Sequence, residues 1–358
     1  MRWLHCSGAD RTSRRITVQV AQELGPFVDC TSNQAIAFFE LSRPASGGDG
    51  GAQLHHAALI REALDDAGGK LKHLRDGLPL EEFVVEVLMV KLQLRIAPSV
   101  TGYLHVQTNP KLSFCTAGTI SNAKRIVAIF NALAPDLIPR RRVCIKIPAT
   151  WEGLQACRAL EAEEAEEEEQ GIATLATTMF CMEQAVLAAD AGCTYIAPYI
   201  NELKVHFEKG YVDANKAFAF CREAQAYYVA RGHRTRVLAA SLTSVDEVMQ
   251  LAGVQHVTVA PGLLRELAAR DAASSTWDGG SSSSSRLGEY FAQGQPVRED
   301  MEASWEGVGY DGLVRDEGAW RLAFARSGFG ASEGKIVQAV NYFCEFQEEL
   351  EELVRGRC

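Results

Sequence analysis

The sequence predicts an α/β fold, namely a (β/α)8 barrel with a C-terminal helical extension. Short apolar segments of strand length alternate with segments of helical spacing along most of the chain, and no predicted strand leads into a G-x-G-x-x-G turn. The 358 residues suit one barrel of ~250 residues with extensions, and 47% of them are hydrophobic, enough for a large core. A doubly wound sheet is the alternative arrangement.

The elements follow from hydrophobic periodicity and from the residues that interrupt it. Strands are predicted at 27–30, 103–107, 143–147, 172–176, 194–197, 236–240 and 256–259. Helices are predicted at 54–67, 80–94, 116–133, 180–191, 213–230, 245–251 and 263–269, and a further one begins at Trp151. The Arg-rich segment before residue 27 is a poor strand, so the first barrel strand gives no clear signal.

Composition divides the chain into three parts. We expect the barrel domain at 1–271, a Gly/Ser-rich linker at 272–286 and a helical extension at 287–358. Apolar residues of the extension recur at helical spacing: Ile336, Val340, Phe343, Phe346, Leu350 and Leu353. The apolar face of such a helix must pack against something, and the outside of the barrel is the simplest partner.

Charge and cysteine content argue against several classes of function. The net charge of −10 disfavours binding to nucleic acid or to anionic membranes. No apolar run reaches the ~18 residues of a membrane span, and the N-terminus lacks the apolar core of a signal peptide. Ten cysteines without a C-x-x-C pair predict reduced thiols in a cytoplasmic protein. The Glu-rich run at 161–169 is read as a solvated helix end or insert, and no metal site is expected.

One lysine interrupts the strand at 143–147. Lys146 lies in an apolar run that ends at Pro148, and Thr150 is placed to cap the helix that follows. Burial would disfavour its ammonium form and lower its pKa, and a neutral amine can attack a ketone to form a Schiff base. The alternative is an edge-strand lysine whose charged end reaches water. Lys146 would lie near the carboxyl end of a barrel strand, where catalytic residues of this fold sit.

Two stretches around this lysine carry a family resemblance. The sequence IKIPATWEG at 145–153 resembles the Schiff-base lysine motif of transaldolases. GIATLATTMFCMEQAVLAADAGCTYIAPYINEL at 171–203 resembles the next two strand-helix units of that family, in family order and spacing. The resemblance implies a (β/α)8 barrel that needs no cofactor. It also implies a C-terminal helix near the barrel mouth, where Trp320, Phe324 and Phe329 would help to close the site.

The same resemblance assigns roles to individual residues. Lys146 matches the Schiff-base lysine, and Thr177 matches the threonine that positions the catalytic water. Thr174 falls where typical transaldolases have an asparagine, and Ser241 matches a serine near the phosphate site. Asn33 lies in a loop similar to the family's D-x-T-T-N-P loop, where it would bond substrate hydroxyls. A turn-forming asparagine is the alternative for Asn33.

Two departures from the family concern the catalytic water. Gln107 stands where typical transaldolases hold this water with a glutamate, and a glutamine cannot take its proton. Tyr199 stands where they have a phenylalanine, and its phenol adds a donor. Fructose-6-phosphate aldolases, a branch of the same superfamily, resemble this chain at both positions.

Two further departures concern charge. Glu202 and Thr243 occupy the positions of the phosphate-binding arginines, although charge-assisted donors are the usual phosphate ligands. Lys204 is the first candidate for a replacement cation, with His206 and Lys216 as the others. The family's strand-one acid–base matches Asp10, and Asp29 is the nearest carboxylate if Asp10 does not fill that role.

These assignments predict a transaldolase. The enzyme would move a dihydroxyacetone unit from sedoheptulose 7-phosphate or fructose 6-phosphate to an aldose phosphate, in the pentose phosphate pathway. The expected partners are small sugar phosphates, with no nucleic acid and no membrane, and a homodimer is left open. One alternative is a lyase that releases dihydroxyacetone. The other is a catalytically impaired barrel with a binding role.

Overall fold

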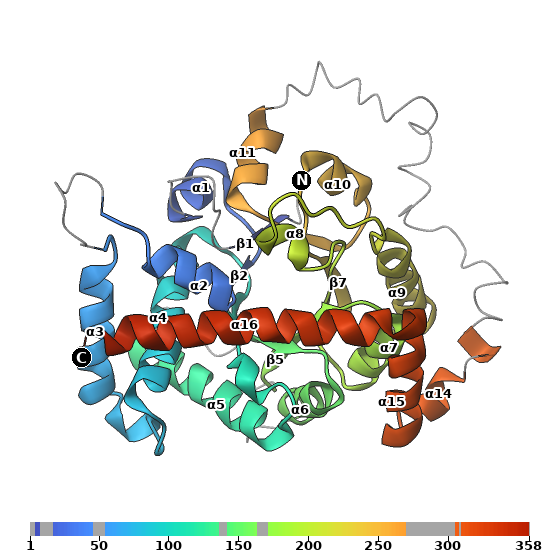
Figure 1. Ribbon diagram of the computed structural model, residues 1–358, viewed down its shortest axis with the longest axis horizontal. Coiled ribbons are helices and arrows are strands. Elements are labelled where there is room, and N and C mark those ends of the chain that lie inside the picture. The colour runs from blue at the N-terminus through green and yellow to red at the C-terminus, as the bar shows by residue number, and fades with distance from the viewer. Residues whose placement is uncertain are drawn as a thin grey trace.

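A computed structural model describes residues 4–7, 17–45, 54–135, 142–162, 171–269, 305–307 and 309–357. Parallel strands form a closed barrel within these ranges, with neighbours in chain order from the first strand to the eighth (Figure 1). The first strand pairs with the eighth and thereby closes the barrel. The predicted (β/α)8 architecture is confirmed, and the doubly wound alternative is wrong.

Seven of the eight strands lie at or beside the predicted apolar runs, and the first lies inside the N-terminal segment that gives no strand signal. They are β1 (Leu4–Ser7), β2 (Cys30–Thr31), β3 (Leu104–Gln107), β4 (Val143–Pro148), β5 (Ala173–Met179), β6 (Tyr195–Pro198), β7 (Arg236–Ala239) and β8 (His256–Val259). The strand predicted at 27–30 begins only at Cys30. Before it, Phe27 forms an isolated bridge to Val100, and the Asp29 side chain accepts the Tyr103 N–H at 2.6 Å.

Helices surround this barrel. Those up to the seventh strand are α1 (Thr17–Leu24), α2 (Gln34–Leu41), α3 (Ala57–Gly68), α4 (Leu80–Ile96), α5 (Thr116–Leu133), α6 (Trp151–Glu161), α7 (Met182–Asp190), α8 (Lys204–Phe207) and α9 (Phe218–Ala230). The later ones are α10 (Val245–Gln250), α11 (Pro261–Ala269), α14 (Tyr310–Leu313), α15 (Glu317–Arg326) and α16 (Ala331–Arg355). Single 3-10 turns are η1 (Lys72–Leu74), η2 (Ala97–Ser99), η3 (Pro110–Leu112) and η5 (Ser327–Gly330).

The largest difference between a predicted and an observed helix boundary is at the start of α9. The helix predicted at 213–230 begins at Phe218, because the Asp213 side chain binds backbone groups of the loop before the helix. Its carboxylate accepts the backbone N–H of Glu202 at 2.8 Å and that of Asn215 at 2.7 Å. The linker predicted at 272–286 lies outside the described residues. Within the described ranges, no helix is long and apolar enough to cross a membrane.

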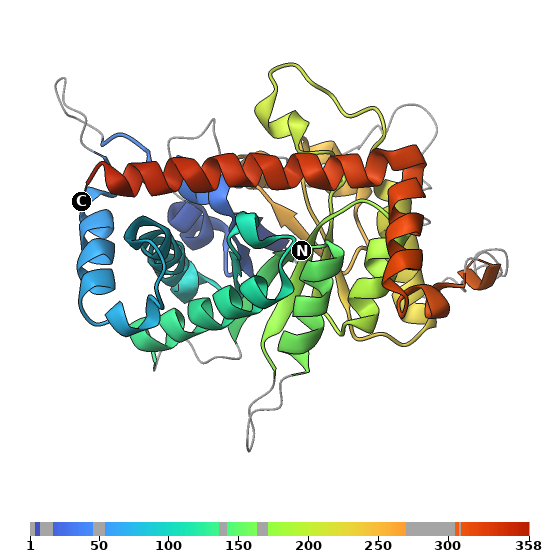
Figure 2. The ribbon, with the colours of Figure 1, turned by 60° about the horizontal axis from the view of Figure 1, so that its bottom comes forward.

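The C-terminal helix α16 lies across the carboxyl ends of the strands (Figures 1 and 2). It packs on α2 and also contacts η3, elements that follow β2 and β3 directly. Its residues Ala339 and Phe343 join the apolar cluster inside the barrel. Phe346 packs on Phe39 of α2 with ring centroids 5.1 Å apart. The helix therefore covers the barrel mouth and does not pack only on the outside.

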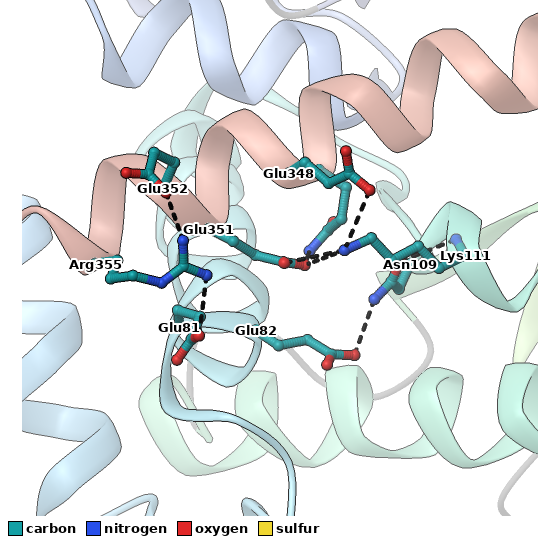
Figure 3. A network of polar contacts seen from close by, with 9 residues as sticks. Glu81, Glu82, Asn109, Lys111, Glu348, Glu351, Glu352 and Arg355 are labelled. Atoms are coloured by element: carbon teal, nitrogen blue, oxygen red, sulfur yellow. Dashed lines mark hydrogen bonds and ion pairs between the residues drawn. The ribbon is translucent and has the colours of Figure 1, made fainter.

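Polar contacts fix the far end of α16 (Figure 3). Arg355 reaches Glu81 of α4 at 3.1 Å, and Lys111 of η3 binds Glu351 at 3.0 Å. Exposed ion pairs of this kind contribute only about 0–1 kcal/mol each. Their main effect is to set the register of α16 against the barrel, while the apolar face supplies most of the free energy of packing.

The aromatic residues expected to help close the mouth lie elsewhere. Trp320 and Phe324 of α15 stack on each other, and Trp320 packs on Trp151 of α6 and donates to the Glu183 carbonyl of α7 at 2.8 Å. These contacts fix α15 beside the barrel. Phe329 is fully exposed, in a turn where it and both flanking glycines have positive φ. The role expected of Phe329 in closing the site stays a prediction.

Candidate active site

The lysine on β4 is buried inside the barrel. Cys144 belongs to the interior apolar cluster, while Ile145 and Ile147 face the surrounding helices, so Lys146 points inward with Cys144. Its side chain is 6% exposed, and in register it lies between Gln107 of β3 and Leu175 of β5. Burial lowers the pKa of Lys146 to about 7. A large share of this amine is therefore neutral near pH 7.

The turn after β4 explains how the lysine is held at the strand end. The Thr150 hydroxyl accepts the Gly153 N–H at 2.9 Å and donates to the Ser113 carbonyl, so it caps α6 as predicted. A Cβ on Gly153 would lie 2.1 Å from the Pro148 carbonyl oxygen. Only glycine fits this close approach, and the motif therefore fixes the strand-to-helix turn that follows Lys146.

Two hydroxyls lie at the ends of the next two strands. The Thr177 hydroxyl of β5 donates to the phenol oxygen of Tyr199, just after β6, at 3.2 Å, and both residues are buried. Burial raises the pKa of Tyr199 to about 12, so the phenol keeps its proton. Because its oxygen accepts from Thr177, the phenol O–H remains able to donate. Phe180 packs against the Tyr199 ring at 5.8 Å.

The backbone is strained beside these hydroxyls. Thr178 has a φ of 57°, and the pairing of β5 with β6 shifts register there. Ser241, at the end of β7, has a φ of 62°. Such conformations cost on the order of 1–3 kcal/mol for residues other than glycine and concentrate at functional sites.

Gln107 completes this group at the end of β3. It is 1% exposed, and neither its amide nitrogen nor its amide oxygen has a hydrogen-bond partner among the described residues. Leaving buried polar atoms unpaired costs about 1–3 kcal/mol. An amide in that state suits a role in binding a water or a substrate. The structure thus brings Lys146, Gln107, Thr177 and Tyr199 together at the carboxyl ends of β3 to β6.

Thr174 is not part of this group. Its N–H and its hydroxyl donate to Glu161 of α6 at 2.7 and 2.8 Å, so its side chain faces outward. Leu175 belongs to the interior cluster instead. Side chains alternate along a strand, so the inward position two residues before Thr177 is Leu175. The substrate-binding role expected of Thr174 is therefore wrong by one residue of register.

Two other residues expected in the active site, Asn33 and Asp29, form hydrogen bonds within the fold. The Asn33 side-chain oxygen accepts the Ile36 N–H at 2.9 Å and caps α2, as in the turn-forming alternative. Asp29 is fully buried, and its second oxygen lies 3.0 Å from Nε2 of His105. Its partners Tyr103 and His105 precede Gln107 by four and two residues, which is roughly 13 and 7 Å along β3 at ~3.3 Å per residue. Asp29 therefore lies nearer the amino ends of the strands than Lys146, which pairs with Gln107. Asp10 lies outside the described residues.

The ends of β6 and β7 form a charged corner. Glu247 of α10 is buried, and its carboxylate accepts the N–H of Thr243 at 2.7 Å and the side-chain amide of Asn201 at 2.9 Å. Lys216 lies 2.7 Å from the same carboxylate. Asn201 and Glu247 are absent from the sequence-based assignment, although Asn201 directly precedes Glu202 and Glu247 lies one helical turn after Thr243.

The remaining expected residues lie around this corner. The Ser241 hydroxyl is 2.9 Å from Nε2 of His206. The Lys204 ammonium lies 5.6 Å from the Tyr211 ring centroid, and the Tyr211 hydroxyl donates to Glu202. Both positions that would hold arginines, Glu202 and Thr243, are therefore engaged with neighbouring side chains.

Comparisons with known proteins agree with these features. A model of the family described as Transaldolase/Fructose-6-phosphate aldolase matches residues 9–316. Transaldolase from Saccharomyces cerevisiae is 34% identical over 244 residues, which cover 67% of this chain and 66% of that protein. Transaldolase from Chlamydia pneumoniae is 31% identical over 198 residues, which cover 54% of this chain and 58% of that protein. The chain thus spans less than two thirds of the length of each of these relatives, 66% of one and 58% of the other.

A likeness among solved structures is more remote. An IMP dehydrogenase/GMP reductase-like protein from Corynebacterium glutamicum matches 73% of this chain and 64% of its own, with a TM-score of 0.37 and 13% identity. So low a score says nothing further about this chain.

Proposed function

The chain belongs to the transaldolase/fructose-6-phosphate aldolase family, and we propose that it is a transaldolase acting through a Schiff base on Lys146. One observation carries the proposal: an inward lysine at a barrel strand end, with its pKa lowered to about 7 by burial alone. Such a group serves as a nucleophile at neutral pH. Gln107, Thr177 and Tyr199 at the neighbouring strand ends supply the polar groups that the chemistry needs.

The proposed reaction begins with the neutral Lys146 amine, which attacks the carbonyl carbon of a ketose phosphate. Water leaves and an imine forms. Removal of the C4 hydroxyl proton then breaks the C3–C4 bond, an aldose phosphate departs, and the electron pair moves into the imine as an enamine. The enamine attacks a second aldose phosphate, and hydrolysis releases the new ketose. The imine accepts the electrons, so the reaction calls for no metal or organic cofactor.

Proton transfer is assigned to a water held at the strand ends. The unpaired amide of Gln107 and the phenol of Tyr199 would hold this water, and Thr177 would orient the phenol. None of these three can take up a proton near pH 7. We propose Asp10 as the acid–base, because it follows β1 by three residues and β1 lies beside β2 and β8. Ser241 is proposed to contact the substrate at the end of β7.

A lyase is the second candidate, because Gln107 and Tyr199 both match the fructose-6-phosphate aldolase branch. The two functions differ in their products. With fructose 6-phosphate and erythrose 4-phosphate, a transaldolase forms sedoheptulose 7-phosphate, whereas a lyase releases dihydroxyacetone. Formation of the heptulose at a rate well above the release of dihydroxyacetone would support the proposal. Dominant release would favour the lyase, and neither product would indicate an impaired barrel.

We also propose a cytoplasmic location and small sugar phosphates as the partners. The described cysteines are free thiols, as expected in a reducing compartment. The net charge of −10 disfavours nucleic acids and anionic membranes as partners.

A further inference from the structure

The charged corner lacks the arginines expected of a phosphate site, yet it contains lysines. Three of them lie at or near it: Lys204, Lys216 and Lys335 of α16. Each can be judged by what its ammonium already contacts, because a cation that is hydrogen-bonded to a buried carboxylate is less available to a ligand than one that only lies near a carboxylate.

Lys216 has a structural role. Its ammonium is 2.7 Å from the buried carboxylate of Glu247, which also binds Thr243 and Asn201. Removing that cation would leave a buried charge poorly compensated. Lys204 lies over the Tyr211 ring, whose hydroxyl donates to Glu202. The Glu202 carboxylate is thus bound to the same ring over which Lys204 lies, and its negative charge would disfavour a phosphate beside Lys204.

Lys335 points towards the barrel mouth. It precedes Ala339 and Phe343 by four and eight residues, so the three share one helix face. Ala339 and Phe343 belong to the cluster inside the barrel. The Lys335 ammonium lies 5.9 Å from the ring centroid of Phe180, and that ring packs on Tyr199. One aromatic ring therefore separates this cation from the group around Lys146.

The same ammonium lies close to the backbone of residue 202. It is 3.8 Å from an Asp213 oxygen, and this oxygen accepts the Glu202 N–H at 2.8 Å. A separation of 3.8 Å is too long for a hydrogen bond, and the ammonium donates none to any residue in the described ranges. The side chain is 22% exposed. Backbone N–H groups of Glu202 and Asn215 already bind the Asp213 carboxylate, which weakens its hold on Lys335.

We propose that Lys335 binds the phosphate of the sugar phosphate substrate. From α16 it supplies the positive charge that the family's arginines would supply from the ends of β6 and β7. The inference rests on the proposed function and names a specificity residue for it. It also gives α16 a role in substrate recognition, since the helix carries the cation to the mouth that it covers.

The test compares phosphorylated and unphosphorylated donors. The rate at which borohydride traps the imine is measured by mass spectrometry with fructose 6-phosphate and with fructose, in the wild type and in Lys335→Met. The ratio of the two rates should fall by on the order of tenfold to a hundredfold in Lys335→Met, as for the loss of one charge-assisted hydrogen bond. Lys335→Arg should keep most of the ratio. Lys70→Met, which removes an exposed lysine of the loop after α3, is the matched control and should not change it.

A second variant guards against misfolding of the first. Glu202→Arg in the Lys335→Met background places a cation where the family has one, and it should restore the phosphate preference. An unchanged ratio in Lys335→Met, or a fall seen only in Lys204→Met, would overturn the assignment. If the wild type traps both sugars equally, the function stands and the Lys335 proposal fails. If it traps neither, the proposed function itself is wrong and the role of Lys335 fails with it.

Discussion

Two regions of the barrel mouth handle charge in opposite ways. Around Lys146 the neighbours are apolar or neutral, and burial alone lowers the pKa of the lysine to about 7. At the corner formed by the ends of β6 and β7, the buried carboxylates of Asp213 and Glu247 keep several donors each. The comparison shows two ways of placing a charged group at one barrel mouth. The proposed nucleophile Lys146 is buried without an oppositely charged partner, whereas the carboxylates of the corner are buried with several hydrogen-bond donors. Removing a lysine should therefore have opposite effects on stability in the two regions.

The largest expected effect is a gain in stability when the catalytic lysine is removed. The pKa of Lys146 is lowered from 10.5 to about 7, so the unfolded chain binds more protons between these values, and stability rises with pH across this window. The cost of burial is fully present below pH 7 and disappears above pH 10.5. Lys146→Met should raise the free energy of unfolding by on the order of 4 kcal/mol at pH 7. Urea unfolding of the wild type and the variant at pH 7 and at pH 10.5 measures this difference in the free energy of unfolding. A gain of equal size at the two pH values would contradict the account.

Removing a lysine from the corner should lower the free energy of unfolding. Lys216→Met leaves the buried carboxylate of Glu247 without its cation. Lys216 is 35% exposed, so solvent screening reduces the loss to about 1–2 kcal/mol at pH 7. Urea unfolding compares this variant with Lys70→Met, which loses an exposed cation. Equal stabilities of these two variants would show that the corner does not depend on the pair.

A new carboxylate beside Lys146 should give this lysine a charged partner, as the lysines of the corner have. Gln107 pairs with Lys146 in register, and its amide is buried without a partner. In Gln107→Glu, the negative charge should favour the ammonium and raise the pKa of Lys146 by about one unit or more. The pH at which imine trapping is half-maximal should rise accordingly, and transfer should gain over release. An unchanged midpoint would mean that residue 107 does not face the amine.

The smallest expected effect concerns the phenol. Tyr199→Phe removes one hydrogen bond with Thr177 and one donor near the proposed water. A neutral hydrogen bond is worth about 1 kcal/mol, so the ratio of transfer to release should shift towards transfer by roughly fivefold. Parallel assays of sedoheptulose 7-phosphate and dihydroxyacetone give this ratio, with Tyr211→Phe as the control for loss of a phenol at the corner. If the two variants behave alike, the role assigned to Tyr199 is wrong.

Much of the fold and of the group around Lys146 could be predicted from the sequence. Strand length, Pro148 and the cap at Thr150 are local signals, and they placed Lys146 at a strand end correctly. Thr174 was misplaced because a slip of one residue turns a side chain to the other face of a strand. The first barrel strand gave no signal because its four residues lie in an Arg-rich segment.

The corner could not be predicted in the same way. Lys335, Asp213 and Glu247 come from segments far apart in the chain, and each looks like an ordinary surface residue in its own segment. Only the fold shows that Lys335 lies within 3.8 Å of Asp213 and that Glu247 is buried. The path of α16 over the mouth likewise depends on its packing against α2, α4 and η3. Asp10 stays a prediction.

The most direct test of the central claim is to trap the imine. The protein is reduced with borohydride in the presence of fructose 6-phosphate and digested with trypsin, and the peptides are mapped by mass. The account predicts one modified peptide, spanning 143–158 and uncut at Lys146, with a yield that rises with pH around a midpoint near 7. Modification of a different lysine, or no modification while Lys146→Met keeps full activity, would contradict the account.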